Sequence, residues 1–377
     1  MQYYVCFNNW KKKRINKSKN LFERCAKNIW SSSLSLDKLT RELIAIQSVT
    51  GNEVKILDFI ERELSNSGFS GTILRNEGGI IAYYPSSKSS IALVGHVDTV
   101  PIDESQVIVD DDSKIYGRGS VDMKSGVAVM LKIMSNNFEN VAAIFYTSEE
   151  GPMVDNGLEI LMPILQKDFN LEFAIILEPT NGEVQLGCLG SVNADLQING
   201  KSAHSARPWM GENPIFKLPE VINYIQNNEV EDNIIDGLLF KKIISATTIT
   251  GGTANNVIPS HINININYRF LPTSEENEAA DFIIESFSKF GEVTIKNTSN
   301  GALPNLESQS IKNFIASTGA KVTPKQAWTD IARFYKEGIP AVNYGPGDPL
   351  LAHSPDEFVN TDQIVESYES IVKYLES

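Results

Sequence analysis

The chain has 377 residues, of which 42% are hydrophobic and 21% charged, so it is long enough to build large hydrophobic cores without disulfides. Its net charge of −14 opposes binding to nucleic acid and to anionic membranes. It contains no apolar run of about 18 residues, the length that a membrane-spanning helix requires. The composition therefore favours a globular protein of two or three domains that binds neither partner.

Residues 1–33 differ from the rest of the chain because they are strongly basic, with eight Lys or Arg residues and one Glu. Neither an apolar signal-peptide core nor a small-residue cleavage site follows the basic cluster. We expect a disordered tail or a start assigned too early. Cys6 and Cys25 lie in this tail and Cys188 is alone in the body, so neither a disulfide framework nor a thiolate metal site is expected, which favours a cytoplasmic location.

From residue 34 onward, predicted helices alternate with predicted buried strands. Apolar residues at three- and four-residue spacing predict helices at 36–47, 52–66, 123–135 and 156–167. Short apolar runs predict strands at 91–94, 141–146, 173–177 and 341–344. This alternation is typical of an α/β domain whose mainly parallel central sheet is flanked by helices.

Between residues 182 and 291 the pattern changes to one expected of an antiparallel sheet. In residues 262–270, apolar side chains alternate with Asn and Arg, as in a strand with one solvated face. Strands are also predicted at 184–198 and 243–249, with helices near 214–227 and 275–290. We therefore predict an inserted α+β domain, and a catalytic domain made of 34–181 and 292–377 that resumes with a strand at 292–297.

The four predicted α/β strands all run into acidic or histidine residues. These residues are His96, Asp98, Glu149, Glu150, Glu178 and His353, and a loop before a predicted helix adds Asp122. Because ligands of open α/β sheets bind outside the carboxyl ends of the strands, we expect these side chains to converge on one crevice.

So many carboxylates repel one another unless cations keep them ionised, and a mixed set of imidazoles and carboxylates suits zinc or a similar ion. The candidate ligands are His96, Asp122, Glu150, Glu178 and His353. They are sufficient for two ions if Asp122 bridges them. Glu149 then remains as a general base beside the reacting water, and Asp98, two residues after His96, can orient that imidazole ring.

Several longer motifs contain these residues. They are His96-Val-Asp98-Thr-Val-Pro, Gly117-Arg-Gly-Ser-Val-Asp122-Met-Lys-Ser-Gly, Glu149-Glu150-Gly, Glu178-Pro-Thr, Gly200-Lys-Ser-Ala-His204 and Ala352-His353. From about residue 36 to the end, the chain resembles the dinuclear zinc family of amino-acid deacylases and carboxypeptidases. Within that family, the strings that begin at His204, Gly301, Trp328 and Gly338 resemble desuccinylases of the actinobacterial type, which act on succinyl-diaminopimelate.

The resemblance implies two divalent ions, zinc with cobalt able to substitute. It assigns His96 and Glu178 to one ion and Glu150 and His353 to the other, with Asp122 bridging them. No nucleotide cofactor is expected, because neither phosphate-binding glycine motif follows a predicted strand.

The resemblance also implies roles outside the metal ligands. Glu149 would be the base and later the proton donor. The inserted domain would pair two chains into a homodimer, in which His204 of one subunit would stabilise the oxyanion in the crevice of the other. The residues expected to hold the substrate are Asn255, Asn256, Arg269, Arg207, Ser191, Thr329 and Arg333.

The function expected from the resemblance is hydrolysis of N-succinyl-LL-2,6-diaminopimelate in diaminopimelate and lysine biosynthesis. Three alternatives share the same chemistry: an N-acetylornithine deacetylase, an N-acyl-lysine or N-acyl-ornithine deacylase, and a carboxypeptidase. A non-catalytic binding protein of the same fold is an alternative of another class, although no ligand and no base of the motif set is missing.

Overall fold

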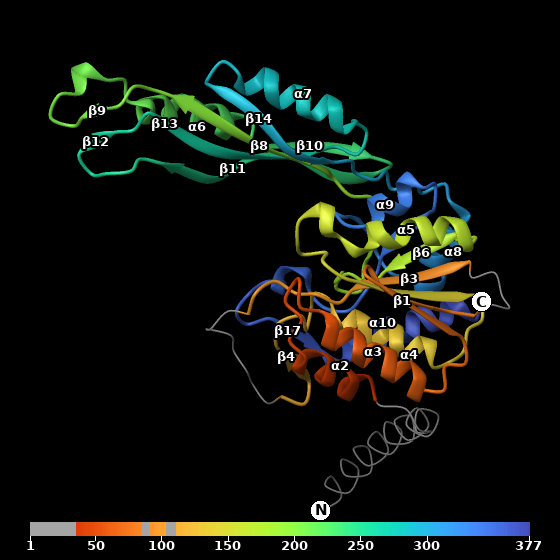
Figure 1. The fold of residues 1–377 in the computed structure, drawn as a ribbon. Coiled ribbons are helices and arrows are strands. Elements are labelled where there is room, and N and C mark those ends of the chain that lie inside the picture. Colours follow the sequence, from red (N-terminus) through yellow and green to blue (C-terminus); the bar gives the residue numbers. More distant parts are fainter. Residues whose placement is uncertain (1–34, 85–89, 103–110) are drawn as a thin grey trace, which may run out of the picture.

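The computed structural model describes residues 35–84, 90–102 and 111–377. The predicted basic tail, residues 1–33, lies outside the described residues. Two sheets of different construction organise the chain, and they lie at opposite ends of the view in Figure 1. None of the helices in the described part of the chain is long and apolar enough to cross a membrane.

The larger sheet has eight strands and contains both parallel and antiparallel pairs. In spatial order its strands are β1 (Thr72–Asn76), β2 (Gly79–Tyr83), β5 (Val141–Tyr146), β3 (Ile91–His96), β6 (Phe173–Ile176), β16 (Ala341–Asn343), β7 (Val184–Leu186) and β15 (Val322–Pro324). Strands β5, β3, β6 and β16 are consecutive and parallel. Their carboxyl ends therefore meet at one edge, as the sequence predicts.

Helices cover both faces of this sheet (Figure 1). One face packs against α2 (Leu36–Ala45), α3 (Val54–Asn66), α4 (Lys124–Met134), α8 (Gln309–Thr318) and α10 (Thr361–Leu375). The other face packs against α5 (Gly157–Asp168) and α9 (Ile331–Lys336). Every residue of α4 is buried, as expected of a helix that packs between the sheet and helices α2, α3 and α10.

The second sheet is antiparallel throughout and has helices on one face. Its strands, in spatial order, are β10 (Val230–Ile235), β11 (Leu238–Gly251), β13 (His261–Phe270), β8 (Gly190–Asn199) and β14 (Glu292–Ser299). Apolar residues of β13 and β8 form a core with helices α6 (Leu218–Asn227) and α7 (Glu276–Phe287). The predicted α/β class with a separate antiparallel sheet is confirmed.

Two predicted strands join a different sheet from the one we expected. Strand β14 pairs with β8 in the five-stranded sheet, so the prediction that residues 292–297 return to the α/β layer is wrong. Its Val293 and Ile295 pack on one side only, as in a half-buried antiparallel strand. Conversely, β7 joins the larger sheet, where all three of its residues are buried, so the inserted sheet begins only at Gly190.

The chain crosses between the two sheets twice, and the two crossings lie side by side. Cys188 and Ala302 exchange backbone hydrogen bonds of 2.9 and 3.0 Å. Gly187 adopts a φ of 61°, and a Cβ there would lie 2.6 Å from the Ala302 carbonyl oxygen, so only glycine fits. This paired crossing forms the connection between the sheets.

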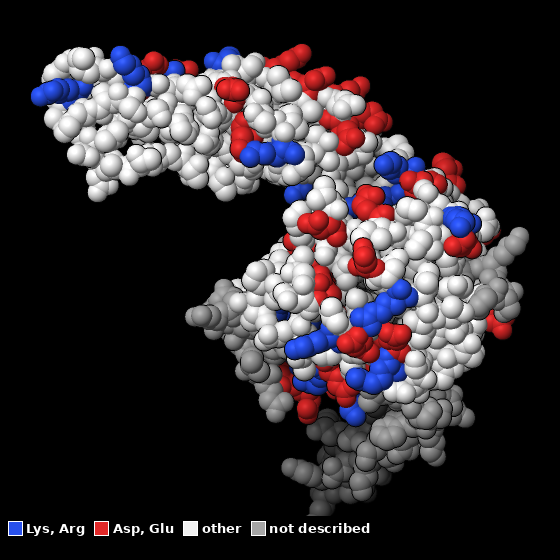
Figure 2. Space-filling view, in the orientation of Figure 1, with Lys and Arg blue, Asp and Glu red and all other residues white. Residues whose placement is uncertain are grey.

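Two short ladders complete the fold. Strand β4 (Lys114–Tyr116) pairs with β17 (Phe358–Asn360), and β9 (Ala203–His204) pairs with β12 (Val257–Ile258). Figure 1 shows β9 and β12 at the end of the inserted sheet that lies farthest from the larger sheet. Figure 2 shows Lys and Arg side chains at this tip and acidic side chains gathered over α7.

Candidate metal centre

The carboxyl ends of the four central strands supply most of the predicted site residues. His96 is the last residue of β3, and Glu149 and Glu150 follow β5 in a short loop. Glu178 follows β6, and His353 lies in the loop after β16. Because these strands are neighbours, their loops lie side by side at one edge of the sheet.

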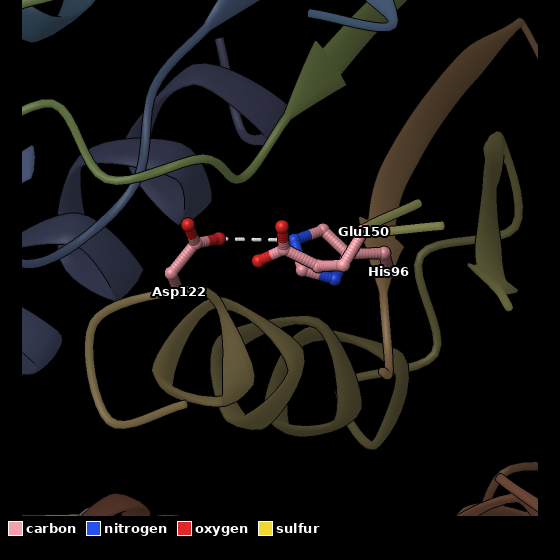
Figure 3. A group of neighbouring side chains, drawn as sticks. All are labelled: His96, Asp122 and Glu150. Carbon is pink, nitrogen blue, oxygen red and sulfur yellow. Dashed lines mark hydrogen bonds and ion pairs between the residues drawn. The ribbon is translucent and has the colours of Figure 1, made fainter. Parts of the chain in front are cut away.

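Asp122 lies two residues before α4, and Figure 3 shows its carboxylate pointing toward His96. Its Oδ1 is 3.0 Å from Nε2 of His96, and its Oδ2 is 3.2 Å from Nε2 of His353. Each carboxylate oxygen thus faces one imidazole, which is the arrangement that a bridging carboxylate requires.

A glutamate accompanies each histidine. Oε1 of Glu178 is 3.8 Å from Nε2 of His96, and Oε1 of Glu150 is 2.8 Å from Nε2 of His353. Ligand atoms of His96, Asp122 and Glu150 all lie within 4.8 Å of one another. The resemblance assigns His96 to one ion and Glu150 to the other. Their closeness is expected, because the Asp122 carboxylate lies between the two His–Glu pairs.

Asp98 contributes to the site through the loop that it holds. Its Oδ1 accepts a hydrogen bond from the backbone N–H of Glu149 at 3.0 Å, and its Oδ2 accepts one from that of Glu150 at 3.1 Å. The Thr50 hydroxyl donates to Oδ2 at 2.8 Å. Nδ1 of His96 lies 3.1 Å from the Asp98 carbonyl oxygen and 3.5 Å from Oδ1. Asp98 therefore orients the ring and fixes the Glu149–Glu150 backbone.

Burial and neighbouring carboxylates raise the pKa of two glutamates in the site. Burial, together with the Asp122 carboxylate, raises the pKa of Glu178 to about 7. Burial, together with Glu178 and Asp330, raises the pKa of Glu149 well above its usual value, against the opposing effect of His96. Hydrogen bonds to Asp122 and Glu150 raise the pKa of His353 to about 10. A donor set of imidazoles and crowded carboxylates fits divalent cations, which relieve this repulsion.

Four other predicted residues lie far along the inserted sheet. His204 is exposed in β9, and Arg207, Asn255 and Asn256 lie in the neighbouring loops, where the Asn256 carbonyl accepts a hydrogen bond from the Ser205 N–H at 2.9 Å. Ten-residue β8 spans about 33 Å between the crossing and this tip. The structure does not bring this group to the metal centre of its own chain.

The remaining predicted residues lie near the crossing or beside α9. Ser191 and Arg269 are opposite each other in β8 and β13, at the end nearest the crossing. Thr329 is buried and its hydroxyl lies 3.2 Å from Oδ1 of Asn343. Arg333 is also buried, and its guanidinium pairs with Asp330 and Glu159. The guanidinium of Arg333 is therefore paired with carboxylates of its own chain.

The structure adds four buried polar residues that the sequence analysis did not single out. Tyr146, at the end of β5, donates a hydrogen bond to Asp330, and its ring centroid is 6.2 Å from that of His96. Arg118 and Glu357 form an ion pair of 2.6 Å next to the Asp122 loop. Arg118 lies within the motif that contains Asp122, and Glu357 lies four residues after His353. Their pairing joins segments far apart in the sequence, which no local pattern reveals.

Comparisons with known proteins agree with this architecture. The sequence profile described as Peptidase family M20/M25/M40 matches residues 92–377. A protein of Mycobacterium tuberculosis, provisionally named succinyl-diaminopimelate desuccinylase DapE, is 36% identical over 344 residues, covering 90% of this chain and 97% of its own. The succinyl-diaminopimelate desuccinylase of Corynebacterium glutamicum is 34% identical over 350 residues, covering 89% and 95%.

Solved structures share the fold at low sequence identity. An M20 family metallo-carboxypeptidase of Sulfolobus solfataricus superposes with a TM-score of 0.73 at 16% identity, covering 91% of this chain and 99% of its own. The YXEP protein of Bacillus subtilis, a dinuclear metal-binding peptidase, gives 0.64 at 18% identity, covering 90% and 96%. The chain belongs to peptidase family M20/M25/M40. It is a metal-dependent hydrolase of that family.

Proposed function

We propose that this enzyme removes succinate from N-succinyl-LL-2,6-diaminopimelate in diaminopimelate and lysine biosynthesis. The observation that carries the chemistry is the position of Asp122, one oxygen toward His96 and the other toward His353. The substrate assignment is supported by the names of relatives at 34–36% identity that cover nearly the whole chain.

The proposed cofactor is a pair of zinc ions, for which cobalt can substitute. His96 with Glu178, and His353 with Glu150, would hold one ion each, and Asp122 would contact both. Bound ions would polarise the amide carbonyl and lower the pKa of water.

Glu149 is the proposed general base. Its backbone N–H is held by Asp98, and burial beside other carboxylates raises its pKa, which increases its affinity for the proton that it takes up. Glu149 takes a proton from the water as the oxygen attacks the amide carbon. It then gives this proton to the leaving nitrogen as the C–N bond breaks, so the products are succinate and the free diamino acid.

The proposed active unit is a homodimer formed through the inserted domains. Large apolar side chains are exposed near the tip, with Trp209 76%, Met210 60% and Phe216 80% exposed. Strand β10 pairs with β11 only as far as Ile243, which leaves the remainder of that β11 edge without a described strand partner. Both features favour burial against a second chain.

In such a dimer, the tip of one subunit would serve the crevice of the other. His204 would donate to the developing oxyanion, a role that contributes about 10²–10³ in rate. Arg207, Asn255 and Asn256 lie beside it, and the basic character of the tip in Figure 2 suits a substrate that carries several carboxylates.

Other predicted substrate residues belong to the subunit that carries the metal centre. Ser191 and Arg269 near the crossing, and Thr329 beside α9, are the proposed contacts for the acyl chain and the amino-acid end. Arg333 is proposed to act in the same region, with its guanidinium anchored by Asp330. Because Cys188 is buried as a free thiol and the proposed substrate is a biosynthetic intermediate, the proposed location is the cytoplasm.

The test is release of free amine from N-succinyl-LL-2,6-diaminopimelate by purified protein, with zinc and after chelation. N-acetylornithine and an N-acyl-lysine serve as matched substrates. Chelator-sensitive turnover that favours the succinyl substrate supports the proposal. Preference for an acetyl substrate would retain the chemistry but reject the substrate, and inactivity on all of them would reject the proposed function.

A further inference from the structure

A buried ion pair connects the loop that carries Asp122 with the loop that carries His353. Nη1 of Arg118 is 2.6 Å from Oε2 of Glu357, and the two side chains are 6% and 0% exposed. Antiparallel pairing of β4 with β17 brings the two segments together, and it continues through a 3.1 Å bond from the Gly117 N–H to the Glu357 carbonyl.

Each member of the pair also binds the backbone of a ligand-bearing loop. Oε1 of Glu357 accepts hydrogen bonds from the N–H groups of Val121, at 2.9 Å, and Asp122, at 3.2 Å. Nη2 of Arg118 donates to the carbonyl oxygen of His353 at 3.3 Å. The ion pair thus fixes the backbone on both sides of the contact between Asp122 Oδ2 and His353 Nε2.

His353 needs such support because of its backbone conformation. Its φ is 63°, in the left-handed region that residues with a Cβ rarely adopt. Its side chain is 49% exposed, so packing around the ring contributes little to its orientation. The bond from Arg118 to its carbonyl ties this strained residue to the buried framework.

We propose that Arg118 and Glu357 are positioning residues that set the separation of Asp122 and His353, and through it the affinity for the metal ion that His353 binds. This inference rests on the metal assignment proposed above. A buried ion pair is by itself weak evidence for stability, since desolvation offsets much of its attraction. Here Nη2 of Arg118 and Oε1 of Glu357 bind the backbone of the two ligand-bearing loops, which indicates a role in holding the ligands.

The experiment measures binding of Co²⁺ to the full-length protein after metal removal, by calorimetry and by the visible absorption of the bound ion. The variants are Glu357→Gln, which retains an oxygen acceptor but loses the charge, and Arg118→Lys, which keeps the charge but loses the forked donor. Leu64→Ala is the control, because it opens a cavity in the hydrophobic core and lies on α3, which is part of neither loop. Thermal unfolding is recorded for all proteins.

We expect the dissociation constant of one Co²⁺ ion to rise about 10- to 100-fold in both variants, the usual effect of losing support around a ligand, with an altered absorption spectrum. The Leu64→Ala protein should melt earlier but bind Co²⁺ like the parent. Parent-like affinity and spectrum in either variant would overturn the inference, even if its Tm falls. If one variant does not fold, the other decides. A parent protein that binds no Co²⁺ would overturn the metal assignment as well, so the two failures are distinguishable.

Discussion

Replacing Asp98 by Asn is the sharpest test of how the strand-end loops are held. The Asp98 side chain is fully buried, and its two oxygens accept the N–H groups of Glu149 and Glu150 and the hydroxyl of Thr50. Asn has nearly the same shape but exchanges one acceptor oxygen for an NH₂ donor. In either orientation of the amide, one of the two backbone N–H groups then faces another donor.

The magnitude follows from these contacts. A buried donor without a partner costs about 1–3 kcal/mol, and the surviving bond loses about 1 kcal/mol with the charge of its acceptor. The loop should therefore be destabilised by about 2–4 kcal/mol, and misplacing Glu149 and Glu150 should lower kcat about 10- to 100-fold.

Hydrogen exchange at the amides of Glu149 and Glu150, measured on metal-free protein, reports this loss locally. A destabilisation of about 2–4 kcal/mol corresponds to exchange about 30- to 1,000-fold faster, at about 1.4 kcal/mol for each factor of ten. Thr50→Val is the matched control, since it removes one hydrogen bond to Asp98 but leaves both amides paired. Parent-like exchange and kcat in Asp98→Asn would refute the reasoning.

Three further predictions concern the proposed chemistry. Glu149→Gln should abolish turnover at nearly unchanged metal content, measured by elemental analysis, and loss of both metals would contradict its assignment as the base. His204→Ala should lower kcat about 10²- to 10³-fold at normal metal content, and unchanged kinetics would remove His204 from the site. Chelation should lower the Tm, because free metal at about 100 times its dissociation constant contributes about 2.7 kcal/mol to stability; an unchanged Tm would argue against a metal centre.

Local sequence patterns were sufficient to predict the strands whose carboxyl ends carry the site residues. The apolar runs at β3, β5 and β6 are buried core strands, and the alternation in residues 262–270 is the half-buried strand β13. The expected convergence of strand ends follows from parallel pairing alone, which is why the relative placement of His96, Glu149 and Glu178 could be predicted.

Sheet membership could not be predicted in the same way, because it depends on which partner a strand finds. Residues 184–186 and 190–199 form one apolar stretch in the sequence, but Gly187 turns the chain so that the two pieces pair in different sheets. Strand β14 has the alternation of its neighbour β8, and only that pairing assigns it to the inserted sheet. Helix α10 was not singled out, although Ile364, Ser367 and Ile371 mark its buried face.

The proposed role of His204 could be predicted from a sequence motif, but its distance from the metal centre of its own chain could not. Motif order carries no information about distance, and His204 follows Glu178 in sequence as closely as Glu178 follows Glu149. Strand β8 nevertheless carries it about 33 Å beyond the crossing, along a sheet whose ladder with β13 is continuous over all ten residues. Bending this sheet to return the tip would break those pairs, whereas a second chain can bring its tip without breaking any. Mixing His204→Ala with Glu149→Gln subunits should therefore restore part of the activity that each variant lacks, because one mixed crevice has both groups intact; no recovery would contradict the shared site.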